Sequence, residues 1–501
     1  MSISVLTKDE SVKSDNYAMT HYGIPSQILM ENAARSAAQI LTEYIKMEDE
    51  ICILCGSGNN GGDGFALARH LDTLGFGKIS VLSIAELSKM SNETKVNYEI
   101  CQKMNLKVIE GNPEIITNEL NQKNYNCYIE ALIGVGGSEN LRGDIIKLLD
   151  SVNSKIGFKV AIDMPAGMNS DTGKKHNSAF RANLIITMLA PKVGFFLNNN
   201  KNYFDEIRIA SLGLNDDFIR QFASAKFYET HDIEKMIGKR EMNSSKFDYG
   251  QVLIIAGSRK YPGAAALTAN AATRCGSGLV YLASTAFHNA LAPEIIQIHL
   301  KSDSGGFICP DNFGELSKMV EKCSSIAIGP GIGDEPETLT LIRNIVEKFP
   351  DKKFVIDADA IKAFTANDKL NMNVILTPHI YEFARLTKIA PKDISENYYE
   401  LTKHYAGKMN CIIHLKSVPA ITFDGKRQVI TTIGNPGMAS GGSGDVLTGI
   451  FASLSARGLS QFEAASLGSF VHAKSGDIAA EKFSQNSMIA SDIIECLKWV
   501  V

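Results

Sequence analysis

The stretch ICILCGSGNNGGDGFALARHLDTL, from Ile51 to Leu74, decides how the first half of the chain is interpreted. Its apolar start indicates a buried strand, a glycine-rich segment follows, and apolar spacing from Phe65 onward predicts a helix. Without Cβ atoms in the way, a phosphate can approach the backbone of such a loop, where free helix N–H groups face it. The stretch therefore predicts an α/β domain with a site for an anionic ligand.

The same alternation of apolar runs and helical stretches continues outward in both directions. Strands are expected at 51–55, 79–84, 128–133, 160–164, 184–189 and 207–212, and in a second series at 252–256, 279–283, 326–328, 354–356, 374–376, 412–415 and 420–423. This pattern is typical of βαβ units around mostly parallel sheets, and residues 26–46 should form an amphipathic packing helix. We predict two different α/β domains, 1–215 and 236–501, joined by a linker region at 216–235.

Composition narrows the class of function. The 501 residues carry 51 Lys plus Arg against 55 Asp plus Glu, so no basic field exists to hold nucleic acid or an anionic membrane. Nine cysteines are few for this length, and acidic residues occupy the start of the chain where a signal peptide would be apolar. We expect a soluble cytoplasmic protein with small-molecule partners that assembles with copies of itself.

Polar side chains mark the ends of several predicted strands in the first half. Gly56, Gly58 and Gly61 satisfy GxGxxG, but no clear ribose-binding acid follows about 20 residues later, which disfavours an ordinary dehydrogenase. Asn59, Asn60 and Asp63 are more polar than a plain turn requires. Ligands of an open α/β sheet lie beyond the carboxyl ends of its strands. Glu130 and Asp163 are therefore the acids expected at the site, although either could simply cap a helix.

This half resembles the NAD(P)H-hydrate epimerases, which have a Rossmann-like fold. The resemblance rests on ILMENAA (28–34), GSGNNGGDG (56–64), EALIGVG (130–136), LRGD (141–144), DMPAG (163–167) and DTG (171–173). It implies that the domain interconverts the R and S hydrates at the hydroxyl-bearing carbon, with Asp163 beside the reacting centre. It also implies a set of substrate-binding residues, which comprises Asn59, Asn60, Gly61, Gly62, Asp63, Gly134, Val135, Gly136, Gly137, Ser138, Glu139, Asn140 and Asp163.

The resemblance further implies a potassium ion, held in the family by an Asn, an Asp and a Ser. The matching positions here are Asn60, Glu130 and Ala166. Only Asn60 keeps the family residue. Glu130 is longer than Asp, and Ala166 offers a backbone carbonyl alone, so these two departures weaken the expected potassium site.

The sharpest motif of the second half is NPGMASGGSGDVLTGI, from Asn435 to Ile450. Its glycines leave N–H groups exposed ahead of a helix expected to begin near Asp445, which makes a nest for a phosphate or oxyanion. A carboxylate at this position can take a proton from a hydroxyl while the nest stabilises negative charge. The plainer interpretation is a glycine-rich turn with Asp445 as helix cap.

Further loops complete a resemblance to the ribokinase-like superfamily, and more narrowly to the ADP- or ATP-dependent NAD(P)H-hydrate dehydratases. They are GSRKYPGAAALTA (257–269), GPGIG (329–333), DADA (357–360), TPH (377–379) with Glu382, and LKSVPAITFDG (415–425). The resemblance implies that Asp445 activates the hydroxyl of the S hydrate for phosphorylation, and that magnesium bridges the nucleotide phosphates, with Asp357, Asp359 and Glu382 as outer anchors. The implied contacts to the hydrate are Ala264, Gly331, His379 and Asp445, and those to the nucleotide are Lys416, Ser417, Val418, Pro419, Ala420 and Gly444.

Two residues depart from the dehydratase pattern: Ser417 replaces a usual Gly, and Lys362 replaces an Asn. Ser417 requires ordinary backbone angles and could change adenosine packing. The lone pair Cys52 and Cys55 should point to opposite faces of a strand and so bind no metal.

The function predicted from the sequence is a bifunctional isomerase and lyase that repairs hydrated NADH and NADPH with ADP or ATP as co-substrate. One alternative is a ribokinase-superfamily kinase that phosphorylates a small alcohol, fused to a nucleotide-binding module. Another makes the amino-terminal domain a sensing or protein-binding module without turnover. The sequence is silent on the choice between ADP and ATP and between NADH and NADPH.

Overall fold

The computed structural model of the chain describes residues 2–137 and 140–501. It divides into two compact units, Ser4–Ala225 and Lys226–Val501, the second of which also takes in residues 2 and 3. The division falls inside the stretch 216–235 expected to link two domains. That stretch is not only loop, because it contains α7 (Asp216–Phe222), β9 (Ala225–Phe227) and the start of α8 (Thr230–Ile237).

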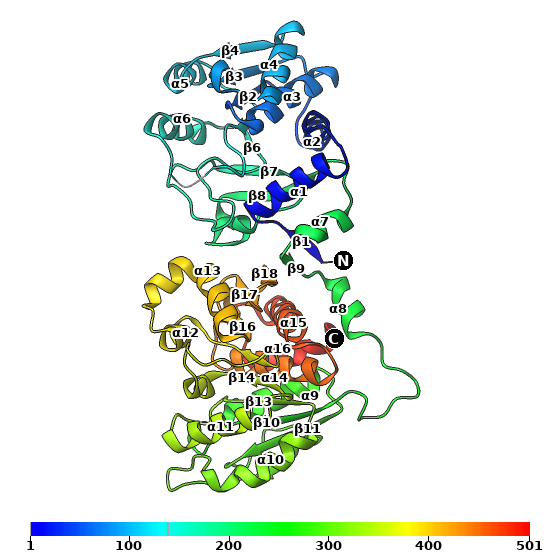
Figure 1. Cartoon of the computed structure of the whole chain (residues 1–501), viewed down its shortest axis with the longest axis vertical. Coiled ribbons are helices and arrows are strands. Elements are labelled where there is room, and N and C mark those ends of the chain that lie inside the picture. Colours follow the sequence, from blue (N-terminus) through cyan, green and yellow to red (C-terminus); the bar gives the residue numbers. More distant parts are fainter. Residues whose placement is uncertain (1, 138–139) are drawn as a thin grey trace. The chain divides into compact units, whose positions relative to one another are not determined.

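The amino-terminal unit is built on a parallel sheet with the strand order β4-β3-β2-β5-β6-β7-β8 (Figure 1). Its strands are β2 (Ile51–Cys55), β3 (Ile79–Ser83), β4 (Lys107–Glu110), β5 (Cys127–Ala131), β6 (Phe158–Ile162), β7 (Ala182–Met188) and β8 (Phe204–Ala210). The chain winds outward from β2 to β4 and then returns to place β5 beside β2. This is the Rossmann order, so the predicted Rossmann-like fold is confirmed.

Helices cover both faces of this sheet. One buried cluster joins it to α2 (Ser26–Leu41), α3 (Asn59–Thr73) and α4 (Asn92–Lys103), and a second joins the other face to α5 (Pro113–Gln122) and α6 (Gly143–Ser154). Cys55 belongs to the first cluster and Cys52 to the second, which confirms that they point to opposite faces. The short β1 (Ile3–Val5) and α1 (Lys8–Thr20) precede these elements.

Two helix boundaries differ from the sequence prediction. The helix expected from Phe65 already begins at Asn59, so most of the supposed glycine loop is its first turn. Helix α2 ends at Leu41 rather than near residue 46. The edge strand β4 was not predicted, because its sequence KVIE is partly exposed and lacks an apolar run.

The carboxy-terminal unit contains a larger sheet in which the order β18-β17-β16-β15-β14-β13-β10-β11-β12 is parallel except at β17 and β18. The strands are β10 (Gln251–Ile255), β11 (Leu279–Ser284), β12 (Ile296–His299), β13 (Ser325–Ile328), β14 (Lys353–Ile356), β15 (Val374–Leu376), β16 (Ile412–Leu415), β17 (Ala420–Phe423) and β18 (Gln428–Thr431). The predicted α/β class therefore holds for both units.

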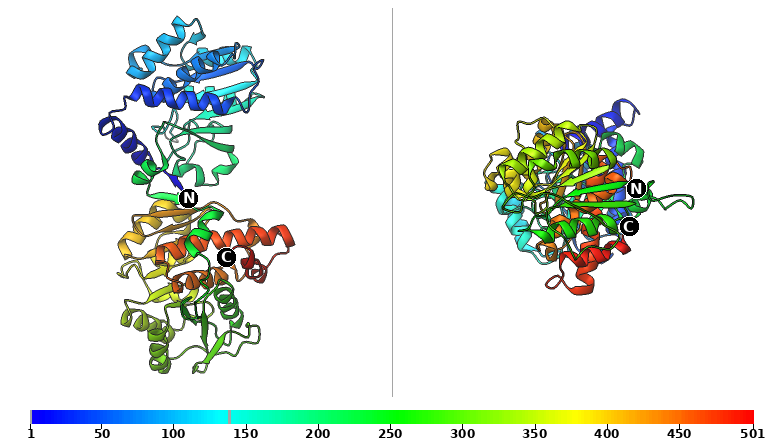
Figure 2. Two further views of the ribbon diagram at one scale, coloured as in Figure 1. Left: turned by 90° about the vertical axis from the view of Figure 1, so that its right-hand side faces the viewer. Right: turned by 90° about the horizontal axis from the view of Figure 1, so that it is seen from below.

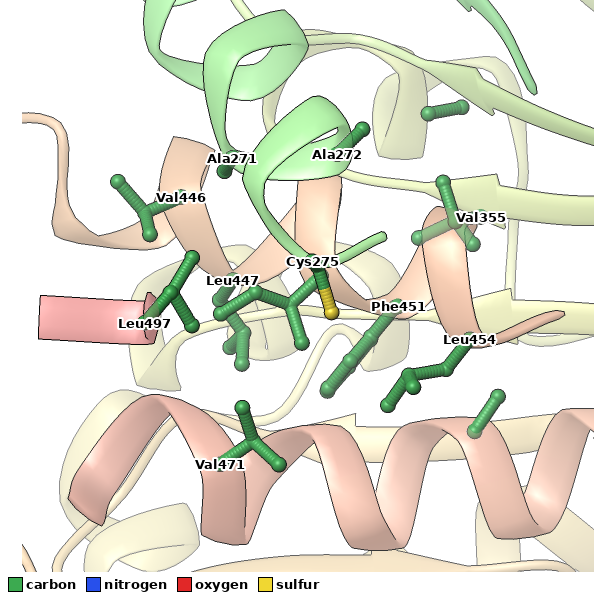
Figure 3. Close-up of a cluster of buried hydrophobic side chains, with 14 of the residues drawn as sticks. Ala271, Ala272, Cys275, Val355, Val446, Leu447, Phe451, Leu454, Val471 and Leu497 are labelled. Carbon is green, nitrogen blue, oxygen red and sulfur yellow. The ribbon is translucent and has the colours of Figure 1, made fainter. Parts of the chain in front are cut away.

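The core of this unit lies between the sheet and three helices, α9 (Pro262–Arg274), α14 (Ser443–Ala456) and α15 (Gln461–Phe483). Figure 3 shows Ala271 and Cys275 from the α9 end facing Val446 and Phe451 of α14, with Val471 of α15 on the other side. Helix α15 is the long orange-red helix in the left view of Figure 2. The remaining helices are α10 (Phe313–Lys322), α11 (Pro336–Lys348), α12 (Ile380–Thr387), α13 (Pro391–Met409) and α16 (Ala490–Cys496). Among the described residues, no helix is long and apolar enough to cross a bilayer.

Candidate active sites

The first site lies where the chain order of the amino-terminal sheet reverses, beyond the carboxyl ends of β2, β5 and β6. Asn60 follows β2, Gly134 follows β5 and Asp163 follows β6. A Cβ atom added to Gly134 would lie 3.0 Å from Oδ2 of Asp163 and 3.3 Å from Cβ of Asn60. The fold thus brings together three residues that the sequence analysis selected from separate loops.

Asn60 is buried, and neither atom of its carboxamide has a hydrogen-bond partner among the described residues. A buried amide left without partners costs free energy, so native structures supply one from protein, water or ligand. This makes Asn60 a candidate for direct contact with a bound polar molecule. Asn59, its neighbour, is exposed.

Asp163 is buried and is held from two sides. Its Oδ1 lies 3.0 Å from the Lys192 ammonium, and its Oδ2 accepts the Val135 N–H at 3.1 Å. Its φ of +65° is left-handed, which is uncommon for a residue other than glycine and typical of functional sites. Burial raises the pKa of two neighbouring carboxyls, Asp15 to about 6 and Asp63 well above its usual range, and the charge of Asp163 adds to both shifts.

Two of the three expected potassium ligands, Glu130 and Ala166, form hydrogen bonds with the backbone of the protein. Oε1 of Glu130 accepts the Leu132 N–H at 2.7 Å, its Oε2 accepts the Ala166 N–H at 2.9 Å, and the Ala166 carbonyl accepts the Phe180 N–H at 3.0 Å. Burial raises the pKa of Glu130 to about 7, against the lowering effect of these backbone donors. Potassium is held by several oxygens that face it together. Of the three residues, only Asn60 has an oxygen with no hydrogen-bond partner among the described residues, while the Glu130 and Ala166 oxygens each already accept one backbone hydrogen bond.

The other residues of the implied epimerase set lie in different surroundings, some buried and some exposed. Gly61 and Gly62 pack inside the protein, where Cβ atoms would meet the Gly56 carbonyl and the side chains of Met30 and Thr94. Val135 to Gly137 form a turn beside Asp163, and Asn140 is exposed. Ser138 and Glu139 lie outside the described residues.

The second site lies at the amino-terminal end of α14. The helix begins at Ser443 with Gly442 as its cap at φ +93°, so Asp445 is the third helical residue and not the cap. The carboxylate of Asp445 has no hydrogen-bond or ion-pair partner among the described residues. Burial, followed by the charge of Asp357, raises the pKa of Asp445 to about 7, while Lys416 acts in the opposite direction.

Lys416 organises the surroundings of Asp445. Its ammonium lies 2.7 Å from Oδ1 of the fully buried Asp357, whose Oδ2 accepts a hydrogen bond from the Thr448 hydroxyl at 2.6 Å. Burial opposes ionisation of Asp357, but Lys416 and the hydrogen bonds hold the pKa of Asp357 below its usual value. The Lys416 ammonium is also 3.5 Å from the position that a Cβ on Gly444 would take. Lys416, Gly444 and Asp445 therefore form one cluster.

The loop after β16, which the resemblance implied would contact the nucleotide, has ordinary backbone at Ser417, whose hydroxyl donates to the Pro419 carbonyl at 2.7 Å. Val418 is 87% exposed, and the bond from it to Pro419 is cis. Ala420 begins β17. His379 lies beside this loop, because the Lys416 N–H donates to the Pro378 carbonyl at 2.9 Å.

His379 itself caps α12. Its Nδ1 accepts the N–H groups of Tyr381 and Glu382, and Glu382 accepts the His379 N–H in return. Partial burial lowers the pKa of this imidazole. Because Nδ1 accepts backbone N–H groups, the ring can donate only from Nε2, which lies 3.4 Å from Oε1 of Glu382.

A cleft of about 420 Å³ carries the other two implied contacts of the hydrate, Ala264 and Gly331. Lys362 also lines this cleft and pairs with Asp334 and Asp359 at 2.7 and 2.8 Å. Sequence reasoning did not assign Lys192 or Thr448 to either site. The sequence did contain a signal for Lys192, which is a charged residue within the apolar run 184–197. A charge buried in such a run requires a partner, so this lysine could have been predicted to pair with an acid.

Comparison with known proteins finds a different family for each half of the chain. The family described as NAD(P)H-hydrate dehydratase matches residues 252–498, and the family described as YjeF-related protein N-terminus matches residues 26–194. A bifunctional NAD(P)H-hydrate repair enzyme of Dictyoglomus turgidum is 34% identical over 99% of this chain and 98% of its own length. Its counterparts in Thermofilum pendens and Moorella thermoacetica are 31% and 30% identical, over 96% and 99% of this chain and 93% and 96% of their own lengths.

Among solved structures, a ribokinase-like superfamily protein of Enterococcus faecalis is 26% identical, with a TM-score of 0.49 over 55% of this chain and 95% of its own. The full-length likeness to the curated relatives decides the family. The chain belongs to the bifunctional NAD(P)H-hydrate repair enzymes.

Proposed function

We propose that this chain repairs hydrated NADH and NADPH in two steps. The amino-terminal unit interconverts the R and S hydrates, and the carboxy-terminal unit dehydrates the S hydrate at the expense of ADP or ATP. The observation that carries the proposal is the unpaired Asp445 carboxylate, held at a helix amino-terminus beside the Lys416 and Asp357 ion pair. An acceptor for a proton and donors for a phosphate are thereby placed side by side.

In the dehydratase step, Asp445 accepts the proton of the substrate hydroxyl while the hydroxyl oxygen bonds to the terminal phosphorus of the nucleotide. The nucleotide leaves shortened by one phosphate. The carbon–oxygen bond then breaks, inorganic phosphate departs, and loss of a ring proton restores the nicotinamide double bond. Backbone N–H groups at the start of α14 and the Lys416 ammonium stabilise the negative charge that moves during the transfer.

Magnesium bound to the nucleotide would supply further positive charge to its phosphates. Asp357 and Asp359 already pair with Lys416 and Lys362, and Glu382 caps α12, so each would face such an ion through water. Magnesium usually keeps several waters and binds substrate phosphates directly, which suits this arrangement. The loop from Lys416 to Ala420 would contact the adenosine and phosphates, and Ala264, Gly331 and His379 the hydrate.

In the epimerase step, Asp163 takes the proton of the hydroxyl on the hydrated carbon, a carbonyl forms there, and the ring carbon–nitrogen bond breaks with its electron pair left on nitrogen. When the nitrogen adds back to the other face of that carbonyl, the proton returns to the oxygen and the other epimer is formed. Asn60 supplies amide hydrogen bonds to the substrate, which would satisfy its unpartnered carboxamide. Residues Gly134 to Gly137 would form the wall opposite. We also place the enzyme in the cytoplasm, a proposal supported by nine free cysteine thiols.

The proposal is tested with the full chain, ADP or ATP, and a mixture of both hydrates of NADH. The unmodified chain should restore nicotinamide absorbance from both epimers. Asp445→Asn should restore none yet still equilibrate the epimers. Asp163→Asn should consume the S hydrate and leave the R hydrate to its spontaneous rate.

A matched control is Asp311→Asn, which removes an exposed acid from the carboxy-terminal unit and should change neither activity. Accumulation of a stable phosphorylated alcohol without nicotinamide absorbance would favour a small-molecule kinase instead. Substantial dehydration by Asp445→Asn would remove that residue from the mechanism.

A further inference from the structure

Lys192 is almost completely buried in the amino-terminal unit, with 2% of its side chain exposed. Its ammonium lies 3.0 Å from Oδ1 of Asp163, 2.9 Å from the Thr187 hydroxyl, and 3.0 and 3.1 Å from the carbonyls of Met188 and Ala190. Burying an ammonium is costly unless it is paired and hydrogen-bonded. Four acceptors around three N–H groups meet that requirement and leave the ammonium no hydrogen to offer a substrate.

The two oxygens of Asp163 have different surroundings. Oδ1 lies among the Lys192 ammonium, the Thr187 hydroxyl and the Met188 N–H. Among the residues that the structure describes, Oδ2 accepts the Val135 N–H alone, and it lies on the side of Gly134 and Asn60. The carboxylate is therefore held by one oxygen and presents the other to the proposed substrate position.

Lys192 is itself fixed by the amino-terminal segment of the same unit. The Leu6 N–H donates to the Pro191 carbonyl at 2.9 Å, and the Val193 N–H donates to the Leu6 carbonyl at 3.1 Å. These bonds hold the backbone on both sides of Lys192. The segment before α1, for which the sequence analysis found no role, thus supports the site through this lysine.

Lys192 also acts on a neighbouring carboxyl. Burial and then the charge of Asp163 raise the pKa of Asp15 and Asp63, and the ammonium of Lys192 counteracts this at Asp15. Without the ammonium, Oδ1 of Asp163 would keep only two neutral donors at 3.4 Å, the Thr187 hydroxyl and the Met188 N–H. The carboxylate would then be free to turn toward solvent, where hydration favours it.

We infer that Lys192 is a positioning residue of the epimerase site, whose ammonium fixes Oδ1 of Asp163 and so aims Oδ2 at the hydroxyl of the hydrated carbon. This inference rests on the proposed role of Asp163. Because Lys192 acts through Asp163 and does not touch the substrate, its loss should affect kcat and leave substrate binding largely intact. A small displacement of a catalytic group can cost about 100-fold in rate.

The test measures R-hydrate consumption by the full chain, with the chain's own dehydratase activity as an internal reference. Lys192→Met keeps the apolar stem and removes the charge. We expect kcat for epimerisation to fall about 100-fold with KM changed less than about threefold. The matched control Lys175→Met removes a less buried ammonium, which bonds to Asn200 and the Asn198 carbonyl, and should leave epimerisation unchanged.

A double-mutant cycle separates positioning from a general structural role. In an Asp163→Asn background, Lys192→Met should leave any residual rate above the spontaneous rate unchanged, because the group that it positions is already gone. An equal loss in both backgrounds, or an increase in KM with kcat unchanged, would overturn the inference. If Asp163→Asn itself leaves epimerisation intact, the proposed function of Asp163 fails first, and the two failures are distinguished.

A second variant keeps the inference testable if Lys192→Met does not fold. Thr187→Val is nearly isosteric and removes one hydroxyl that holds the ammonium. It should lower kcat for epimerisation about fivefold without changing KM. When it is combined with Asp163→Asn, the loss of rate should be smaller than the sum of the two single effects on the free-energy scale. An unchanged kcat in a folded Thr187→Val chain would overturn the inference.

Discussion

Asp445 is a carboxyl whose surroundings raise its pKa to about 7, through burial first and the charge of Asp357 second. A base must be ionised to accept a proton, so the fraction of active enzyme falls as pH decreases through this value. We expect kcat/KM for the S hydrate to fall about tenfold per pH unit below pH 7, and to level off above it. Rates measured from pH 5.5 to 8.5 at saturating nucleotide check this, and a flat profile would contradict it.

Glu130 shows how one methylene changes a site. Its carboxylate accepts hydrogen bonds from the backbone N–H groups of Leu132 and Ala166. The family pattern has the shorter Asp at position 130 and a Ser at position 166. We expect replacement of potassium by sodium to leave epimerisation within about twofold, because backbone N–H groups already bond to the Glu130 and Ala166 oxygens that would have to distinguish the ions.

The same residues supply a matched variant for this prediction. Glu130→Asp combined with Ala166→Ser restores the family pattern. The shorter carboxylate loses a backbone hydrogen bond and so has an oxygen free for the ion, and the serine adds a hydroxyl. Epimerisation by the double variant should become potassium-dependent. A strong potassium requirement in the unmodified chain would refute our interpretation of Glu130.

At the scale of elements, the carboxyl ends of parallel strands and the first turns of the following helices build both sites. Helix α3 starts close to the turn that follows β2, and a Cβ on Gly61 would lie 1.8 Å from the Gly56 carbonyl oxygen. No side chain fits at that distance, so the helix can approach the strand only because residue 61 is glycine. The glycines here serve packing as well as ligand approach.

Gly61→Ala should therefore destabilise the amino-terminal unit by more than about 2 kcal/mol, because the backbone must shift to admit the methyl group. Gly58→Ala is the matched control, since that residue has φ −83° and nothing within 4 Å of an added Cβ. It should change stability by less than about 0.5 kcal/mol. Denaturant unfolding followed through epimerase activity measures both, and comparable losses would contradict the packing argument.

Considered as a whole, the molecule is two α/β units with different sheets and separate cores. Each unit contains its own site, built from its own strand ends. The activities should therefore be separable by single substitutions in one unit, as the paired tests of Asp163 and Asp445 require. The family has joined an isomerase and a lyase in one chain, and the local chemistry of each site remains distinct.

Much of this organisation could be predicted from the sequence, because it depends on local patterns. Buried parallel strands are nearly continuous apolar runs, so β15, β16 and β17 were predicted with their observed bounds. The half-exposed edge strand β4 has no such run and was missed. The glycine motifs located both sites for the same local reason, since they mark strand-to-helix turns.

The partners of each polar residue were decided only by tertiary structure. Sequence spacing does not show that Lys192 contacts Asp163, that Thr448 and Lys416 share the carboxylate of Asp357, or that Glu130 bonds to Ala166. These contacts join residues far apart in the chain, and they form because a buried charge or amide must find a partner wherever the fold places one. The sequence by itself determined the two-domain α/β architecture and the residues available for chemistry. The tertiary structure decided which acids remain unpaired, which are committed to the backbone, and which lysine positions the proposed base.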